Sequence, residues 1–223
     1  MHQIKLDDYL VNYQVFFKNN KHIYLRVRHG KLIITCPKNY KSNQIKDFIV
    51  HHKDWIIRRL EEKKLDLYHP KQMKIWGKTY GVVIDESLDE HMKVLGHQIL
   101  IKTYDRQLIE SFYQSEVMEK VRFLLSEHAS QLNDIYPVKK LKFKTQLMSS
   151  RLGSCHVKKK TIKMNSILAR LDPKFFTLVF FHEYAHLRFP HHQDDFHHLL
   201  EKLVPNHKTQ SRLLTKEVRG FVY

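Results

Sequence analysis

Apolar and polar residues alternate in three short stretches near the start of the chain, which is the pattern of strands with one buried face. The alternating stretches cover residues 11–17, 23–27 and 32–36. The pairs Asn19-Asn20 and His29-Gly30 lie between them and are typical of hairpin turns. The pattern therefore predicts a meander of three strands.

Apolar residues then recur at helical spacing from Ser42 to about Lys64, and Ser42 is a residue type that caps helix N-termini. Further along the chain, residues 75–84 predict a second hairpin, and Gly96 predicts the turn of a third. We therefore expect residues 1–104 to form a β-rich N-terminal region that consists of a sheet with one helix.

The rest of the chain, residues 105–223, alternates helices with short strands. Asp172 and Pro173 are residue types that cap and begin a helix, and an apolar run follows them until Pro190. The other predicted elements are a helix over 108–132, paired strands over 141–144 and 161–165, and a final helix over 196–204. The two regions together predict an α+β protein.

The composition fits a folded protein with an ordinary core. The 223 residues include 13 Phe and 11 Tyr, and no run is long and apolar enough to cross a membrane. The N-terminus lacks the apolar segment of a signal peptide, so we expect a cytoplasmic protein. The two cysteines, Cys36 and Cys155, suggest neither a disulfide framework nor a Cys-x-x-Cys zinc site.

The formal net charge of +16 suggests an anionic partner such as nucleic acid. No acidic residue lies between Asp134 and Asp172. The basic residues of this stretch are Lys139, Lys140, Lys142, Lys144, Arg151, Lys158, Lys159, Lys160, Lys163 and Arg170. The segment 139–170 is therefore our candidate nucleic-acid surface, although a solvated basic surface explains the same residues.

The chemistry of the chain centres on His182-Glu183-Tyr184-Ala185-His186, an H-E-x-x-H motif in a predicted helix. Residues four apart lie on one face of a helix, so His182 and His186 can bind one metal ion. Glu183 is offset from that face, and it can reach a water bound to the metal without being a ligand.

The surroundings of the motif favour a metal site over a chance match in a chain with 17 histidines. The helix is apolar nearly all round before the motif, as a core helix is, and burying His182, Glu183 and His186 there without a partner would be costly. A third ligand could come from the segment after Pro190, whose candidates are His191, His192, Asp194, Asp195, His197 and His198.

The motifs resemble those of the YgjP-like metallopeptidases, a family similar in style to the SprT-like and WLM proteases. The resemblance covers nearly the full chain, and it includes an Arg-Trp-Gly-Ser-Cys segment that is here Arg151-Leu152-Gly153-Ser154-Cys155. An H-E-x-x-H motif that arose by chance would not be accompanied by this second segment. Leu152 stands where the family usually has Trp.

The family pattern continues with five residues after the H-E-x-x-H motif, then a His and a Phe, which correspond to His192 and Phe196. His191 stands where the family usually has Asn, and His197 where it usually has Trp. The resemblance implies a zincin-like C-terminal domain and a zinc metallopeptidase with one Zn²⁺ per chain. Its metal ligands would be His182, His186 and His192, and its general base Glu183.

Other residues near these motifs have possible roles in the second shell or in substrate binding. Arg151, His156 and Tyr184 are candidates for stabilising the oxyanion, and His191 for orienting a ligand. For Cys155 we expect a small buried side chain, and neither a nucleophile nor a ligand.

Two other classes of function remain open from the sequence. The protein could be a nucleic-acid-associated module with a structural metal, in which case four protein ligands would close the site. It could instead be a zinc hydrolase acting on something other than peptides, because the motif determines the metal chemistry and leaves the scissile bond undefined. For the peptidase we expect a peptide or protein substrate and no membrane association.

Overall fold

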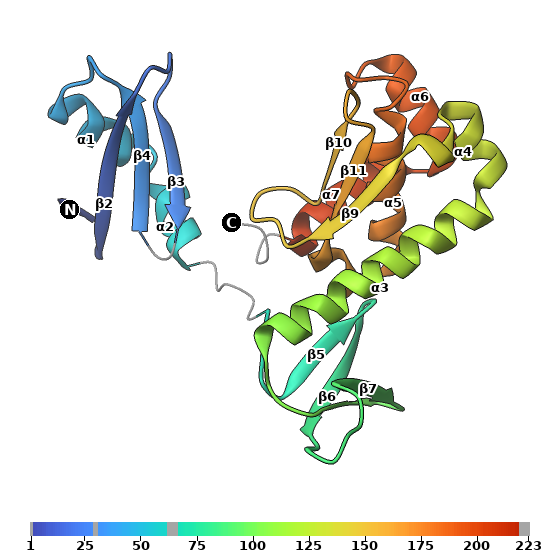
Figure 1. Cartoon of the computed structure of the whole chain (residues 1–223). Helices are drawn as coiled ribbons and strands as arrows, with labels where there is room; N and C mark the ends of the chain where they lie inside the picture. Colours follow the sequence, from blue (N-terminus) through green and yellow to red (C-terminus); the bar gives the residue numbers. More distant parts are fainter. Residues whose placement is uncertain (1, 29–30, 62–66, 219–223) are drawn as a thin grey trace. The chain divides into compact units, whose positions relative to one another are not determined.

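The computed structural model describes residues 2–28, 31–61 and 67–218, and the chain divides into two units with separate hydrophobic cores (Figure 1). The N-terminal unit comprises residues 1–65 and the C-terminal unit residues 66–222. This division lies earlier than the expected one at 104/105. The reason is that residues such as Ile75 and Ile99 belong to the same core as the later helices.

The sheet of the N-terminal unit contains β1 (His2–Leu6), β2 (Tyr9–Lys18), β3 (Tyr24–Arg28) and β4 (Lys31–Pro37). Its order is β1-β2-β4-β3, and β2 and β4 are parallel. The hairpin predicted at Asn19-Asn20 is therefore wrong, because β4 lies between β2 and β3. β3 and β4 pair antiparallel as expected, while the turn predicted at His29-Gly30 lies outside the described residues.

Two helices follow, α1 (Ser42–His51) and α2 (Lys53–Glu61), where one was predicted. His52 leaves the helical conformation, with φ −103° and ψ 19°, and separates them. The N-cap of α1 is Lys41 and not Ser42, and the Lys41 N–H donates to Oε1 of Gln44 at 2.9 Å. The helices pack on one face of the sheet and form a core of Leu6, Val11, Tyr13, Leu32, Ile34, Cys36, Ile45, Ile49 and Ile56.

The C-terminal unit begins with a sheet of β5 (Gln72–Ile75), β6 (Lys78–Ile84), β7 (Met92–Leu95) and β8 (Gln98–Ile101). Its order is β5-β6-β8-β7, with antiparallel pairs β5–β6 and β7–β8. The hairpin predicted at Gly96 is thus confirmed. The other was predicted from strands over 75–80 and 82–84, whereas residues 78–84 form one strand and the hairpin turn lies between β5 and β6. The turn between β5 and β6 places Trp76 and Gly77 at φ 49° and 81°, and Gly96 has φ 58° in the turn between β7 and β8.

The predicted helix over 108–132 forms as two helices, α3 (Arg106–Glu127) and α4 (Ala129–Ile135), separated at His128. A second sheet contains β9 (Lys142–Gln146), β10 (Gly153–His156) and β11 (Thr161–Asn165) in the order β10-β11-β9. β9 and β11 pair as predicted, in parallel, and β10 adds an antiparallel edge strand. The 3₁₀ turns η1 (Val138–Lys140) and η2 (Ser166–Arg170) flank this sheet.

The apolar helix α5 (Pro173–Ala185) lies in the core of this unit, against the β9–β11 sheet (Figure 1). Its predicted start is confirmed, because the Asp172 carboxylate accepts a hydrogen bond from Lys174 N at 2.9 Å. α6 (Asp194–Leu203) was predicted, whereas α7 (His207–Glu217) was not. The chain has the expected α+β architecture. Among the described residues, no helix combines the length and apolar character needed to cross a membrane.

A buried arginine of η2, 3% exposed, packs against α3 just before the start of α5. The Arg170 guanidinium lies 3.5 Å from the centre of the Tyr113 ring, and its Nη2 is 3.7 Å from Glu110 Oε2. Nearby, the Trp76 N–H donates to the Ala169 carbonyl at 2.6 Å. A buried charge needs compensating partners, and Arg170 finds them on α3, which connects η2 to that helix. The backbone hydrogen bond of Trp76 connects η2 to the turn between β5 and β6. These contacts fix the segment from which α5 departs.

Candidate metal centre

Three imidazoles converge at the end of α5. His182 and His186 lie one turn apart near the end of this helix, and His192 comes from the loop before α6. One ligand atom from each lies within 4.8 Å of the others, and the Nε2 atoms of His182 and His192 are 3.1 Å apart. Nitrogens bound to a tetrahedral zinc are about 3.3 Å apart, as follows from Zn–N distances near 2.05 Å. The three residues therefore fit a single ion.

One aromatic ring supports all three imidazoles. Phe196, in the first turn of α6, is fully buried. Its ring centre lies 5.0 Å from that of His182, 4.8 Å from His186 and 4.7 Å from His192. Because this packing restricts each ring, the ligands are held close to one another by the apolar core of the unit.

A backbone carbonyl orients the second ligand. Nδ1 of His186 lies 3.2 Å from the carbonyl oxygen of Phe189, and in the Nδ1–H tautomer it donates a hydrogen bond to that oxygen. Nε2 of His186 is then free to bind a metal, the arrangement common to histidine ligands. From the sequence we expected a side chain such as His191 in this role.

Two of the imidazoles, those of His182 and His186, are in the state that binds metals. Burial, followed by the nearby His186 and His192, lowers the pKa of His182 to about 4. Burial is also the main cause that lowers the pKa of His186. Both rings are therefore neutral near pH 7, and a neutral ring nitrogen has the lone pair that coordination requires.

Glu183 lies beside the triad but outside it. The residue is 8% exposed, and burial raises the pKa of its carboxyl group to about 7. A hydrogen bond from the backbone N–H of Cys155 and the charge of Arg151 act in the opposite direction. The carboxylate is held toward β10, so it can exchange protons near neutral pH without binding the ion itself.

A glycine in β10 makes room for this carboxylate. A Cβ atom at Gly153 would lie 2.6 Å from Cγ and 2.8 Å from Oε1 of Glu183, closer than real Cβ contacts. Sequence reasoning noted Gly153 as part of a motif and missed this role. The signal was present, because a glycine within a strand often marks a close approach of another group.

Residues 21–217 match the family described as YgjP-like, metallopeptidase domain. The chain belongs to the YgjP-like metallopeptidase family. No curated protein matches it. A solved structure, the metallopeptidase zymogen of Pyrococcus abyssi abylysin, aligns over 48% of this chain and 99% of its own with 18% identity and a TM-score of 0.39. A similarity at that level carries no weight for function.

In this YgjP-like chain, the segment before β10 is held by one buried amide. The Asn165 side chain donates to the carbonyls of Met148 at 2.8 Å and Arg151 at 2.6 Å. Its oxygen accepts hydrogen bonds from the N–H groups of Met148 and Ile167, both at 3.2 Å. This side chain therefore fixes the path of residues 148–151 toward Gly153. Sequence reasoning did not identify Asn165.

The remaining predicted residues divide between the site and the rest of the fold. Arg151 is exposed, and its charge acts on Glu183. His191 is exposed and lies outside the triad. His156 accepts a hydrogen bond from the Lys159 N–H at 3.2 Å, within the turn after β10. Tyr184 is fully buried and donates to the Tyr136 carbonyl at 2.7 Å, so the fold does not bring it to the imidazoles.

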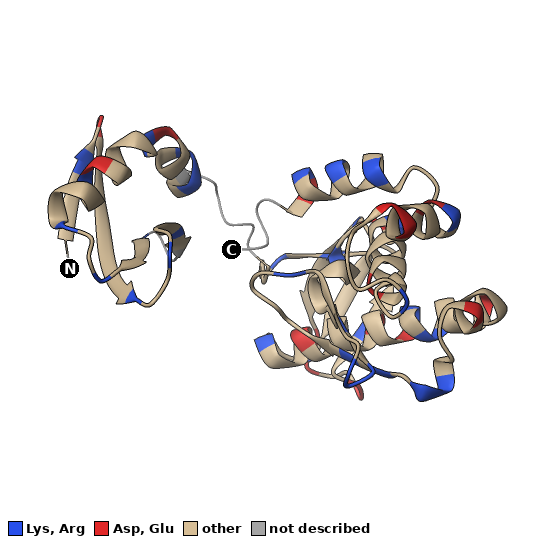
Figure 2. Cartoon of the chain, turned by 90° about the horizontal axis from the view of Figure 1, so that it is seen from above, with Lys and Arg blue, Asp and Glu red and all other residues tan. Residues whose placement is uncertain are grey.

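The charged segment 139–170 contributes lysines to one face of the β9–β11 sheet. Lys144 pairs with Lys163, and Lys142 lies two residues before Lys144 on the same face. The opposite face carries Phe143 and Ile162 and packs against the core. Lys and Arg are distributed over both units (Figure 2), and the sequence has 39 of them against 23 Asp and Glu. The basic sheet face is thus separate from the imidazole triad.

Cys155 is half-buried and is expected to be unreactive. Burial, with a smaller contribution from the charge of Glu183, raises the pKa of its thiol to about 11. Because the thiolate is the reactive form, we predict alkylation by iodoacetamide at pH 8 to be about ten- to a hundredfold slower than for free cysteine. The rate should keep rising up to about pH 11. Peptide mapping by mass spectrometry would measure it, and a fast reaction that levels off near pH 8.5 would indicate an activated thiol.

Proposed function

We propose that this YgjP-like protein is a zinc-dependent metallopeptidase with one Zn²⁺ per chain, held by His182, His186 and His192. The observation that carries the proposal is the convergence of three imidazoles beside a buried carboxylate that is not among them. A set of three nitrogen donors suits zinc and leaves a position for a further ligand.

Zinc and the protein would supply different parts of the reaction. When bound, zinc lowers the pKa of water to about 7 and polarises a carbonyl group. Glu183 accepts the proton of the attacking water at its carboxylate and passes it to the amine that leaves. Its pKa of about 7 suits both halves of this exchange, because the group gives up a proton as readily as it takes one near neutral pH.

The substrate would bind along β10. This strand lies at the edge of its sheet, next to Glu183 through Gly153 and the Cys155 N–H (Figure 1). An extended peptide can add to such an edge by main-chain hydrogen bonds, which brings its carbonyl groups past the site. Of the residues expected to stabilise the oxyanion, Arg151 is the one whose charge acts at Glu183.

Zinc removal and restoration test the proposal. The chelated protein should lose hydrolysis of a mixed peptide library, and one equivalent of Zn²⁺ should restore it. His192→Ala should lose most of its zinc affinity, while the matched variant His191→Ala keeps it, because His192 belongs to the triad and His191 does not. Metal titration and mass spectrometry of the library measure both effects.

Two results would contradict the proposal in different ways. The reverse ranking of His191 and His192 would mean that the third ligand is assigned one residue too late. Stoichiometric zinc binding without cleavage of any peptide would exclude the peptidase. The structural site or the hydrolase of a non-peptide substrate would then be the remaining function.

A further inference from the structure

The sheet of the N-terminal unit has one face that its helices do not cover. Val11 and Tyr13 of β2 belong to the core, so the residues that alternate with them along the strand point to the other face. We call this surface the open sheet face. Its residues are Gln3, Lys5, Leu10, Asn12, Gln14, Phe16, Lys18, Tyr24, Arg26, Lys31, Ile33, Thr35 and Pro37.

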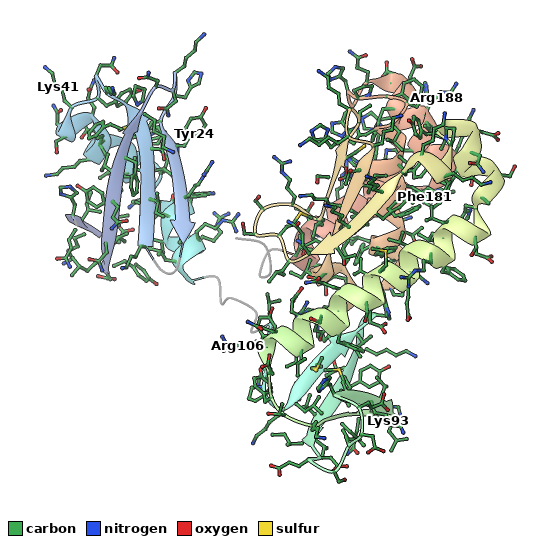
Figure 3. All side chains as sticks on the ribbon, viewed as in Figure 1. Tyr24, Lys41, Lys93, Arg106, Phe181 and Arg188 are labelled. Atoms are coloured by element: carbon green, nitrogen blue, oxygen red, sulfur yellow. The ribbon has the colours of Figure 1, made fainter. Side chains whose placement is uncertain are left out.

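Two aromatic side chains lie abreast on the open sheet face. Phe16 on β2 pairs with Thr35 on β4, and Thr35 pairs with Tyr24 on β3. Neighbouring strands are about 4.8 Å apart, so the two rings are separated by about 10 Å with a small residue between them. Phe16 is 47% exposed and Tyr24 48%. In Figure 3, Tyr24 projects from the start of β3.

Neither aromatic residue has a structural partner that explains its position. Among the residues that the structure describes, Phe16 and Tyr24 make no ring–ring or cation–π contact. Single exposed apolar residues are common on protein surfaces, whereas two rings placed abreast across three strands form a platform. Flat rings with accessible faces are what a nucleobase stacks on.

The charges around this platform have one sign. Lys5, Lys18, Arg26 and Lys31 lie on the open sheet face, which carries no acidic residue. None of these four forms an ion pair within the described part of the chain. Residues 1–65 as a whole carry 14 Lys and Arg against 6 Asp and Glu. The face therefore attracts a polyanion.

We infer that the open sheet face binds single-stranded nucleic acid, with bases stacked on Phe16 and Tyr24 and phosphates bound by Arg26 and the neighbouring lysines. The two rings can stack only on bases that are exposed, and the bases of a duplex are already stacked on one another. An acidic protein would use the charges alone and would have no need of the two open rings. Because the two rings stack on unpaired bases, the open sheet face should bind single strands in preference to a duplex.

Fluorescence anisotropy with the full chain and a labelled 20-nucleotide oligo(dT) tests this inference. Phe16→Ala and Tyr24→Ala should each weaken binding about five- to a hundredfold, which is the range for loss of one stacked base. The matched control is Phe17→Ala, because Phe17 is on the same strand and 51% exposed, but its pairing with Cys36 places it on the opposite face. This control should bind as the unchanged protein does.

Salt dependence tests the phosphate contacts separately. Affinity should fall with salt, and Arg26→Gln or Lys18→Gln should each reduce the log–log slope by about 0.7. A duplex of the same length should bind more weakly. The inference is overturned if the Phe16 and Tyr24 variants bind normally, if poly-glutamate competes as well as oligo(dT), or if only Lys144→Gln and Lys163→Gln weaken binding. The last result would assign the nucleic acid to the β9–β11 sheet instead.

Discussion

Glu183→Gln is expected to reduce peptide hydrolysis by about 10²- to 10⁴-fold while one zinc ion remains bound. The physical reason is the separation of roles at the end of α5. The carboxylate points toward β10 and is not among the three donors, so its replacement by an amide removes the base and leaves the ligands. Steady-state hydrolysis of a fluorogenic peptide and zinc content after gel filtration measure the two effects.

The matched variant for this experiment is His186→Ala, which should lose both zinc and activity. It removes a ligand from the same helix, three residues further along. If Glu183→Gln also released the metal, Glu183 would be a ligand and the division of roles would be wrong. If it kept full activity, the proton would be taken by another group.

Gly153→Ala is expected to lower activity by about 10²-fold and to leave zinc affinity unchanged. The added methyl group would lie 2.6 Å from Cγ of Glu183, so the carboxylate has to move away from β10. A displacement of about 1 Å in a catalytic group costs on the order of 10² in rate. The comparison of kcat with zinc content in the purified variant isolates this effect, because the three atoms nearest to the added methyl group all belong to Glu183.

Gly81→Ala is the control for this substitution. Gly81 is also a strand residue, in β6, and a Cβ there meets no atom within 4 Å. It should retain activity and stability. Normal activity of Gly153→Ala would mean that Glu183 has a second position from which it works, and the close packing against β10 would then be incidental.

Local residue patterns predicted the elements that depend on nearby residues. Asp172 and Pro173 marked the start of α5, and Gly96 marked the turn of one hairpin. The residue pattern did not predict features that depend on contacts between segments far apart in the sequence. Apolar spacing continues through His52 and His128, so it gave no sign that a helix ends there. The parallel pairing of β2 with β4 likewise has no local signal.

The same distinction between local and distant determinants applies to the candidate metal centre. The four-residue spacing of His182 and His186 follows from helix geometry, and the structure places them as predicted. The third member, His192, came from the family resemblance, since the residues alone left six candidates. The Phe189 carbonyl, the Cys155 N–H and the space at Gly153 were missed because backbone groups and empty space have no residue type of their own.

The three imidazoles and the Glu183 carboxylate rest on different supports, although α5 carries both His182 and Glu183. Phe196 of α6 contacts the three imidazoles together. The Glu183 carboxylate is held by β10 instead. Mutations that alter the packing of β10 can therefore change turnover while the affinity for the ion is conserved.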